Sequence, residues 1–88
     1  MNPISRLLLT AYRHRIVEAT PEEGLARLAE YAREPNTDFR DAVAACLRSG
    51  LIRDPVRLRE GALQCHWRLE LTEEGQVEVR TLLGSGST

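Results

Sequence analysis

The fold is decided by residues 39–83, which contain Arg48-Ser49-Gly50-Leu51-Ile52 and Leu69-Glu70-Leu71-Thr72-Glu73-Glu74-Gly75. Apolar residues recur at helical spacing before the first stretch, and a glycine at position 50 is typical of a helix end. Between the two stretches, apolar and polar residues alternate as they do in strands. Thr72 with two glutamates after it is typical of a helix start. The segment therefore predicts a helix, a β-hairpin and a short final helix, in this order.

The alternating stretch also predicts how the hairpin is paired. A two-residue turn at Glu60-Gly61 would bring apolar side chains opposite apolar ones. The facing pairs are then Leu58 with Leu63, Val56 with Cys65, and Arg57 with Gln64. A shift by one residue would move the apolar side chains to the polar face. By the same alternation, we expect Trp67 to point into the core and His66 to point to solvent.

A first helix is expected at the N-terminus. Asn2-Pro3 is a typical helix start because it supplies a capping side chain and then a proline at the first helical position. Apolar residues at three- and four-residue spacing extend this helix to about Val17. Its opposite side carries Arg6, Arg13 and His14, which we interpret as a solvated face.

Two further helices are expected before the hairpin. Thr20-Pro21-Glu22-Glu23 begins one of them with a proline and a capping box, and Glu34-Pro35 ends it. The next runs from Phe39 to Arg48, with Thr37 or Asp38 as its cap. The sequence thus predicts an α+β fold with three helices, then the hairpin, then the last helix.

The composition is that of one ordinary globular domain. The chain has 88 residues, of which 42% are hydrophobic and 28% are charged, and this length has room for one core. We assign residues 1–83 to one domain and interpret residues 84–88 as a flexible tail. No apolar run approaches the roughly 20 residues that a bilayer span requires, and the N-terminus lacks a signal-peptide pattern. We therefore expect a cytoplasmic protein without a membrane partner.

Few residues are candidates for chemistry. Cys46 and Cys65 lie at apolar positions, which favours buried hydrophobic side chains over a zinc site with His14 and His66. No nucleophile, base and acid occur at a recognisable spacing, and no glycine-rich loop follows a strand. We therefore predict no catalytic residue, no metal, no cofactor and no enzyme. A metal or redox sensor built on both cysteines and His66 is a minor alternative.

The charge distribution is uneven along the chain. All twelve basic residues are arginines, yet the net charge is −1. Residues 40–68 hold six arginines and three acids, a balance of +3, whereas residues 69–88 hold four glutamates and one arginine, a balance of −3. Any nucleic-acid surface must therefore be a local patch. A GC-rich genome would also explain the use of arginine in place of lysine.

The order of elements resembles the winged helix-turn-helix domains of MarR-like and PadR-like bacterial transcription regulators. The resemblance rests on Ser49-Gly50-Leu51-Ile52 and Leu71-Thr72-Glu73-Glu74-Gly75. It implies a recognition helix before Gly50 that enters the major groove of double-stranded DNA, and a wing on the DNA backbone. Together with the local charge, it predicts these DNA-binding residues: Thr37, Arg40, Ala44, Arg48, Arg53, Arg57, Arg59 and Arg68. A homodimer through the first and last helices is expected, because two-fold proteins match palindromic sites.

The same helix admits a second interpretation. Asp38 and Asp41 lie at its start, where they suit the helix dipole but would face phosphates unfavourably. Ala44 and Ala45 offer little beyond contact with a thymine methyl group. The alternative is therefore a winged-helix module that binds another protein as an adaptor or inhibitor, without DNA.

Overall fold

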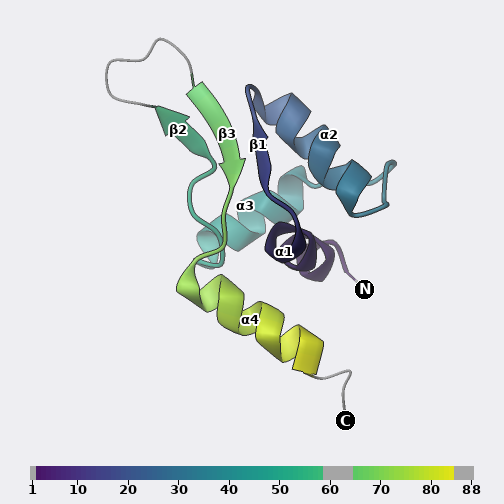
Figure 1. Cartoon of the computed structure of the whole chain (residues 1–88), viewed down its shortest axis with the longest axis vertical. Coiled ribbons are helices and arrows are strands. Elements are labelled where there is room, and N and C mark those ends of the chain that lie inside the picture. The colour runs from purple at the N-terminus through teal and green to yellow at the C-terminus, as the bar shows by residue number, and fades with distance from the viewer. Residues whose placement is uncertain (1, 59–64, 85–88) are drawn as a thin grey trace.

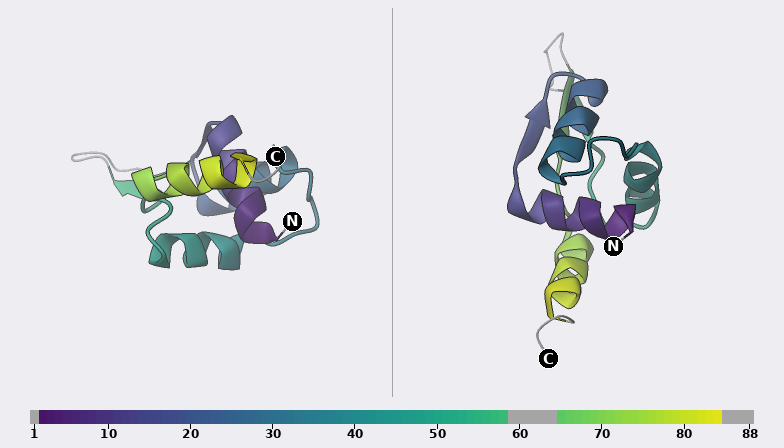
Figure 2. Two further views of the ribbon diagram at one scale, coloured as in Figure 1. Left: turned by 90° about the horizontal axis from the view of Figure 1, so that it is seen from below. Right: turned by 90° about the vertical axis from the view of Figure 1, so that its right-hand side faces the viewer.

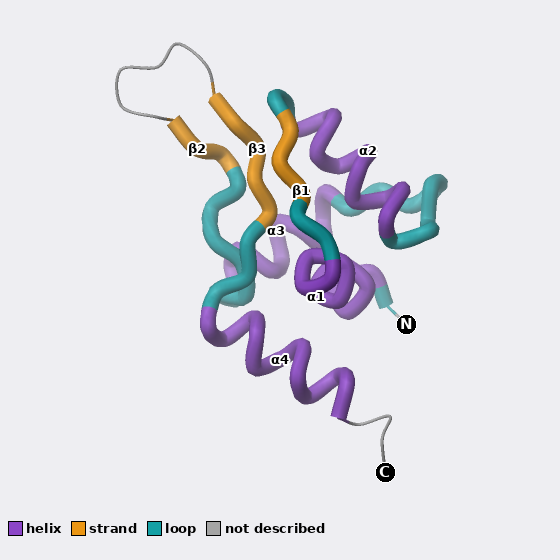
Figure 3. Tube along the Cα trace, viewed as in Figure 1, coloured by secondary structure: helices purple, strands orange, loops and turns teal. Residues whose placement is uncertain are grey.

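The computed structural model describes residues 2–58 and 65–84 and forms an α+β domain of four helices and a small antiparallel sheet (Figure 1). The elements along the chain are α1 (Pro3–Arg13), β1 (Ile16–Glu18), α2 (Pro21–Tyr31), α3 (Arg40–Arg48), β2 (Val56–Leu58), β3 (Cys65–Leu69) and α4 (Glu73–Gly84). Figure 3 shows the strands grouped together, with the helices around one end and one face of the sheet. The predicted α+β class is confirmed.

The prediction for the first helix is wrong at its C-terminal end. Helix α1 stops at Arg13 and does not continue to Val17, because residues 16–18 form strand β1. Ile16 is buried and Val17 is exposed, which is the alternation of a strand with one covered face. Both residues are β-branched and fit a pleated surface well. A strand therefore separates the first two helices, and the predicted order of three helices followed by a hairpin is incorrect.

Three of the helix starts are those that the sequence predicts. The side chains of Asn2, Thr20 and Thr72 accept hydrogen bonds from backbone N–H groups three residues further on, at 2.8, 3.2 and 3.1 Å. Each bond satisfies a donor that the first helical turn leaves without a partner. Helix α3 begins differently, because Phe39 occupies the cap position without a side-chain bond. The Asp38 carboxylate instead accepts from the N–H of Arg40, at 3.0 Å.

The sheet has the strand order β1-β3-β2, and both pairings are antiparallel. The register between β2 and β3 differs from the prediction by two residues. The observed pairs are Val56 with Trp67, Arg57 with His66, and Leu58 with Cys65. A shift by two preserves which face each side chain occupies, so Trp67 is buried and His66 is exposed as expected. Leu63, Gln64 and the predicted Glu60-Gly61 turn lie outside the described residues.

The reason for this register lies at the far end of the hairpin. Ile52 forms an isolated bridge with Leu71, and the N–H of Arg53 donates to the carbonyl of Glu70 at 3.0 Å. These contacts continue the observed pairing back to the end of α3. The register is thus supported where the chain enters and leaves the sheet, whereas the prediction relied on an assumed turn.

The core lies between the sheet and the helices. The right view of Figure 2 shows the sheet on one side and α3 on the other, with α1 running below both, and α2 packs against β1 and β3. The largest fully buried side chains are Phe39, Leu7, Leu8, Ile16, Leu28, Ile52, Val79 and Cys46. Gly24 allows a close approach here, since a Cβ atom at this position would lie 2.0 Å from the indole ring of Trp67. The structure also confirms that Gly50 ends α3 with a left-handed backbone, at φ 72°.

Candidate functional site

The predicted DNA-binding residues fall into two separate places in the structure. Arg40, Ala44 and Arg48 are exposed on α3, at the four-residue spacing that aligns side chains on one side of a helix. Thr37, in the loop before α3, is partly buried. The opposite side of α3 carries the buried Ala42 and Cys46, which join the core.

The charges on the exposed side of α3 nearly cancel. The guanidinium of Arg40 lies 4.0 Å from the carboxylate of Asp38, and both side chains are about 70% exposed, at 68% and 73%. Asp41 lies in the first turn, and Arg48 lies in the last turn, where it suits the helix dipole. Two arginines against two aspartates leave this surface without net charge.

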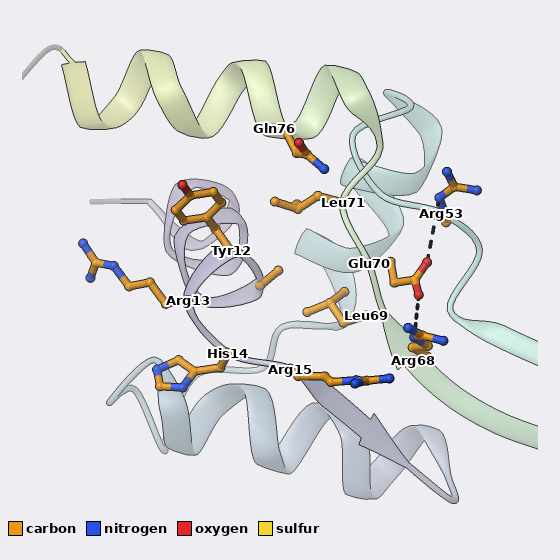
Figure 4. Close-up of a pocket in the computed structure, with 11 residues that line it drawn as sticks. Tyr12, Arg13, His14, Arg15, Arg53, Arg68, Leu69, Glu70, Leu71 and Gln76 are labelled. Atoms are coloured by element: carbon orange, nitrogen blue, oxygen red, sulfur yellow. Dashed lines mark ion pairs between the residues drawn. The ribbon is translucent and has the colours of Figure 1, made fainter.

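Arg53 and Arg68 gather around one carboxylate, away from α3. Nε of Arg53 lies 3.8 Å from Oε2 of Glu70, and Nε of Arg68 contacts Oε1 of the same residue (Figure 4). Trp67 and Leu69 in β3 point into the core, so Arg68 between them lies on the outer face of the sheet. The structure therefore separates this pair from the α3 arginines.

A pocket with a volume of about 690 Å³ lies at the C-terminal end of α1 and is lined in part by Arg53, Arg68 and Glu70. We call it the α1-end pocket. Figure 4 shows that α1 and the following loop, the end of β3 and the start of α4 contribute to it. Its lining consists of Ala11, Tyr12, Arg13, His14, Arg15, Arg53, Arg68, Leu69, Glu70, Leu71 and Gln76.

The α1-end pocket is the more positive of the two surfaces. Four arginines and one glutamate line it, a formal charge of +3 in a chain whose net charge is −1. Within residues 2–58 and 65–84, Arg13 and Arg15 pair with no carboxylate. Their guanidinium groups therefore remain available to an anionic ligand.

A second, smaller groove of about 460 Å³ adjoins this pocket and shares Arg13 and His14 with it. The ring of His14 stacks on Tyr31 with 4.4 Å between the centroids and 8° between the planes. Arg6 and Arg33 line the same groove, and Arg6 pairs with Glu34 at 3.4 Å. The basic surface thus continues from the α1-end pocket along α1 to the end of α2.

Sequence reasoning did not predict that Arg13, His14 and Arg15 line one pocket with Arg53 and Arg68. Arg13 and His14 were interpreted as part of a solvated helix face, and Arg15 was placed inside a helix that ends before it. The sequence signal that could have found them is the pair of β-branched residues Ile16 and Val17, which indicates strand β1. The pairing of Ile16 with Leu69 places Arg15 opposite Glu70, one residue further along the ladder.

The remaining candidates contribute less. The backbone of Arg57 pairs with His66, while the side chain of Arg57 and all of Arg59 lie outside the described residues. Burial raises the pKa of the Cys46 thiol, which disfavours the reactive thiolate. In the described part of the chain, no three His, Cys, Asp or Glu side chains are grouped so that they could hold a metal. None of the helices described is both long and apolar enough to cross a bilayer.

The chain matches no family model, no curated protein and no solved structure. The functional argument therefore rests on the geometry described above.

Proposed function

We propose that this protein is a winged-helix DNA-binding domain, a transcriptional regulator that places α3 in the major groove and the β2-β3 hairpin against the backbone. The supporting arrangement is α2, a connecting loop and α3, followed directly by two antiparallel strands. Strand β1, which pairs with the other edge of β3, departs from the order on which the resemblance was based. The part of the resemblance that supports the proposal is therefore the helix, loop, helix and hairpin from α2 to β3.

The observation that carries the proposal is the exposed side of α3. Arg40 and Arg48 lie eight residues apart, which corresponds to about 12 Å along a helix axis, with Ala44 between them. A small residue between two arginines lets a helix approach base edges closely, and each arginine can donate two hydrogen bonds to a guanine. The core contacts of Phe39 and Cys46 hold α3 from its other side.

We further propose a homodimer. A single domain with two arginines on its recognition helix would bind DNA weakly, and a two-fold dimer doubles the contacts on a palindromic site. The exposed apolar side chains Val77 and Leu83 on α4 and Ile4 on α1 are candidates for the dimer surface.

The test is selection of preferred sequences from a random duplex pool, followed by binding measurements at several salt concentrations. We expect affinity to fall steeply with salt because phosphate contacts release counterions. Replacing Arg40 and Arg48 together by alanine should relax the sequence preference. Arg80→Ala on α4 is the matched control, since it removes an exposed arginine elsewhere and should leave the preference unchanged. Absence of binding at low salt would reject the proposal.

The second candidate is a winged-helix module that binds a protein through the same side of α3. It is favoured by the pairing of Arg40 with Asp38 and by the exposure of Leu47, which is 40% exposed. A mixed-charge surface with an exposed leucine suits a protein partner better than a phosphate backbone. Under this alternative, Leu47→Ala weakens binding to the partner, whereas duplex DNA gives no measurable binding.

A further inference from the structure

The α1-end pocket gathers positive charge on the side of the molecule away from α3. The right view of Figure 2 shows the sheet on one side of the molecule and α3 on the other, with α1 running below both, and Arg68 lies on the outer face of that sheet. We propose that the α1-end pocket is a second nucleic-acid site, which binds backbone phosphates independently of α3. The proposal goes beyond the major-groove contact of α3 and does not require that contact to exist.

Strand pairing determines where three of the pocket arginines, Arg15, Arg53 and Arg68, lie. The backbone carbonyl of Glu70 accepts a hydrogen bond from the N–H of Arg53 on one side. The register of β1 with β3, continued by one residue, places Arg15 on the other side of Glu70. Arg68 lies two residues before Glu70 and points to the same face. Figure 4 shows Arg15, Arg53 and Arg68 along one edge of the pocket and Arg13 at the opposite edge. Positive groups therefore flank the hollow on two sides.

These groups retain donors for a ligand. An arginine has five N–H donors in a planar fork, and contact with Glu70 occupies only part of those of Arg53 and Arg68. Arg13 and Arg15 have no carboxylate partner within residues 2–58 and 65–84. The fork geometry matches two phosphate oxygens, which a bidentate contact satisfies.

A nucleic-acid backbone fits this pocket better than an isolated anion. The hollow, at about 690 Å³, exceeds the size of one phosphate group, and its arginines are spread over two edges. A regularly charged polymer can contact both edges at once. The adjoining groove adds Arg6 and Arg33, which extends the positive surface along α1 in the way that a backbone requires.

Because the sheet and α3 lie toward opposite sides of the molecule (Figure 2), one straight duplex would not contact both surfaces. A nucleic acid that contacts both must bend around the domain, or two segments must bind one domain. The pocket would then bring a second segment close to the one that α3 reads.

The experiment compares two double variants of the full chain that change the net charge equally. Arg13→Gln with Arg15→Gln alters the pocket, and Arg40→Gln with Arg48→Gln alters α3. Binding of a short duplex of random sequence is measured by fluorescence anisotropy at several salt concentrations. Losing two phosphate contacts should lower the salt slope by about 1.8 and weaken binding about tenfold or more at low salt. Circular dichroism checks that both variants are folded.

The outcomes separate this inference from the proposed function. If both variants lose affinity, the protein has two nucleic-acid surfaces. Loss only in the pocket variant supports the pocket and rejects α3, whereas loss only in the α3 variant overturns the pocket proposal. No loss in either variant overturns both.

Amide chemical shifts give a second measurement that does not depend on a variant. Titration of the wild-type chain with the duplex should shift the amides of residues 13–15, 53 and 68. Poly-glutamate serves as the competing polyanion. Equal shifts with poly-glutamate would overturn the assignment to nucleic acid and indicate an acidic protein partner.

Discussion

The exposed side of α3 and the α1-end pocket both carry arginines, but the two surfaces are built differently. On α3, Arg40 and Arg48 come from one helix and are balanced by Asp38 and Asp41. In the pocket, arginines from three separate segments line one hollow, and two of them, Arg53 and Arg68, contact the carboxylate of Glu70. A surface made by one element can be predicted from local spacing, whereas one made by several elements emerges only when they are assembled.

The ion pairs in the pocket position side chains more than they stabilise the fold. Arg53 is 60% exposed and Arg68 is 42% exposed. Pairs this accessible contribute at most about 1 kcal/mol, because water and salt screen them. Glu70 therefore acts mainly by holding two guanidinium groups at the rim of the same hollow. On α3 the equivalent pairing, between Arg40 and Asp38, restrains only one arginine.

The largest expected effect is a loss of stability when the packing of α3 against the core is weakened. Phe39 is 1% exposed and lies directly before α3. Phe39→Ala should lower the free energy of unfolding by about 3–5 kcal/mol, since it removes a buried ring and leaves a cavity. Urea denaturation measures the loss. Leu47→Ala on the exposed side of α3 is the control and should cost far less. Similar losses in the two variants would show that α3 is not anchored through Phe39.

The packing of the sheet that carries Arg68 is tested by a substitution at Gly24. A Cβ atom at this position would lie 2.0 Å from the Trp67 ring, and this ring is buried. Gly24→Ala should therefore destabilise the domain by about 1–3 kcal/mol through overpacking. Gly84→Ala is the matched control, because a Cβ atom there meets nothing within 4 Å. Thermal unfolding of both variants decides the point. Equal midpoints would contradict the close packing of α2 against β3.

Much of the fold could be predicted because its signals are local. Asn2, Thr20 and Thr72 cap helices from within three residues, and Gly50 ends α3 through its own backbone angle. Strand β1 could not be predicted in the same way. Ile16 and Val17 fit the spacing of α1 as well as they fit a strand, and the partner that decides, Leu69, is distant in sequence.

The candidate site was predictable to the same extent. Helical spacing predicted that Arg40, Ala44 and Arg48 share one exposed side of α3, since one helix positions all three, whereas their binding to DNA stays a prediction. The hairpin register was missed because the pairing of Ile52 with Leu71 governs it rather than a two-residue turn. The α1-end pocket was missed for a related reason: Arg15 joins Arg68 and Glu70 in one pocket lining only because β1 pairs with β3.

Removing one negative charge from each surface should have a smaller effect, on duplex affinity. Glu70→Gln takes the one acid out of the pocket lining, and Asp41→Asn takes one from α3. The amide oxygen of the introduced glutamine can still accept a hydrogen bond from an arginine, so the substitution at Glu70 mainly removes the negative charge. If the pocket contacts phosphates, Glu70→Gln should therefore tighten duplex binding roughly fivefold at low salt, as expected for one charge near a phosphate in water. Asp41→Asn should do the same if α3 contacts the backbone. Titrations of both variants under identical salt show which surface the DNA touches, and unchanged affinity for Glu70→Gln would count against the pocket.

The smallest expected effect concerns Arg33, in the groove beside the pocket. It adopts a left-handed backbone, at φ 59°, in the motif that ends α2. The N–H of Glu34 donates to the carbonyl of Ala29, and that of Arg33 donates to the carbonyl of Glu30. Glycine is the usual residue at this position, because a side chain there costs about 1–2 kcal/mol.

Arg33→Gly should therefore stabilise the domain by about 0.5–1 kcal/mol, since the greater freedom of glycine in the unfolded chain offsets part of the relieved strain. Arg33→Ala is the control that removes the charge but keeps the left-handed strain. Chemical denaturation should separate the two variants, whereas duplex binding should weaken equally in both if the groove belongs to the basic surface. A gain in stability of Arg33→Gly together with a loss of affinity would mean that Arg33 contributes its charge to binding although its backbone conformation is unfavourable for folding. Unchanged affinity in both variants would confine the basic surface to the α1-end pocket.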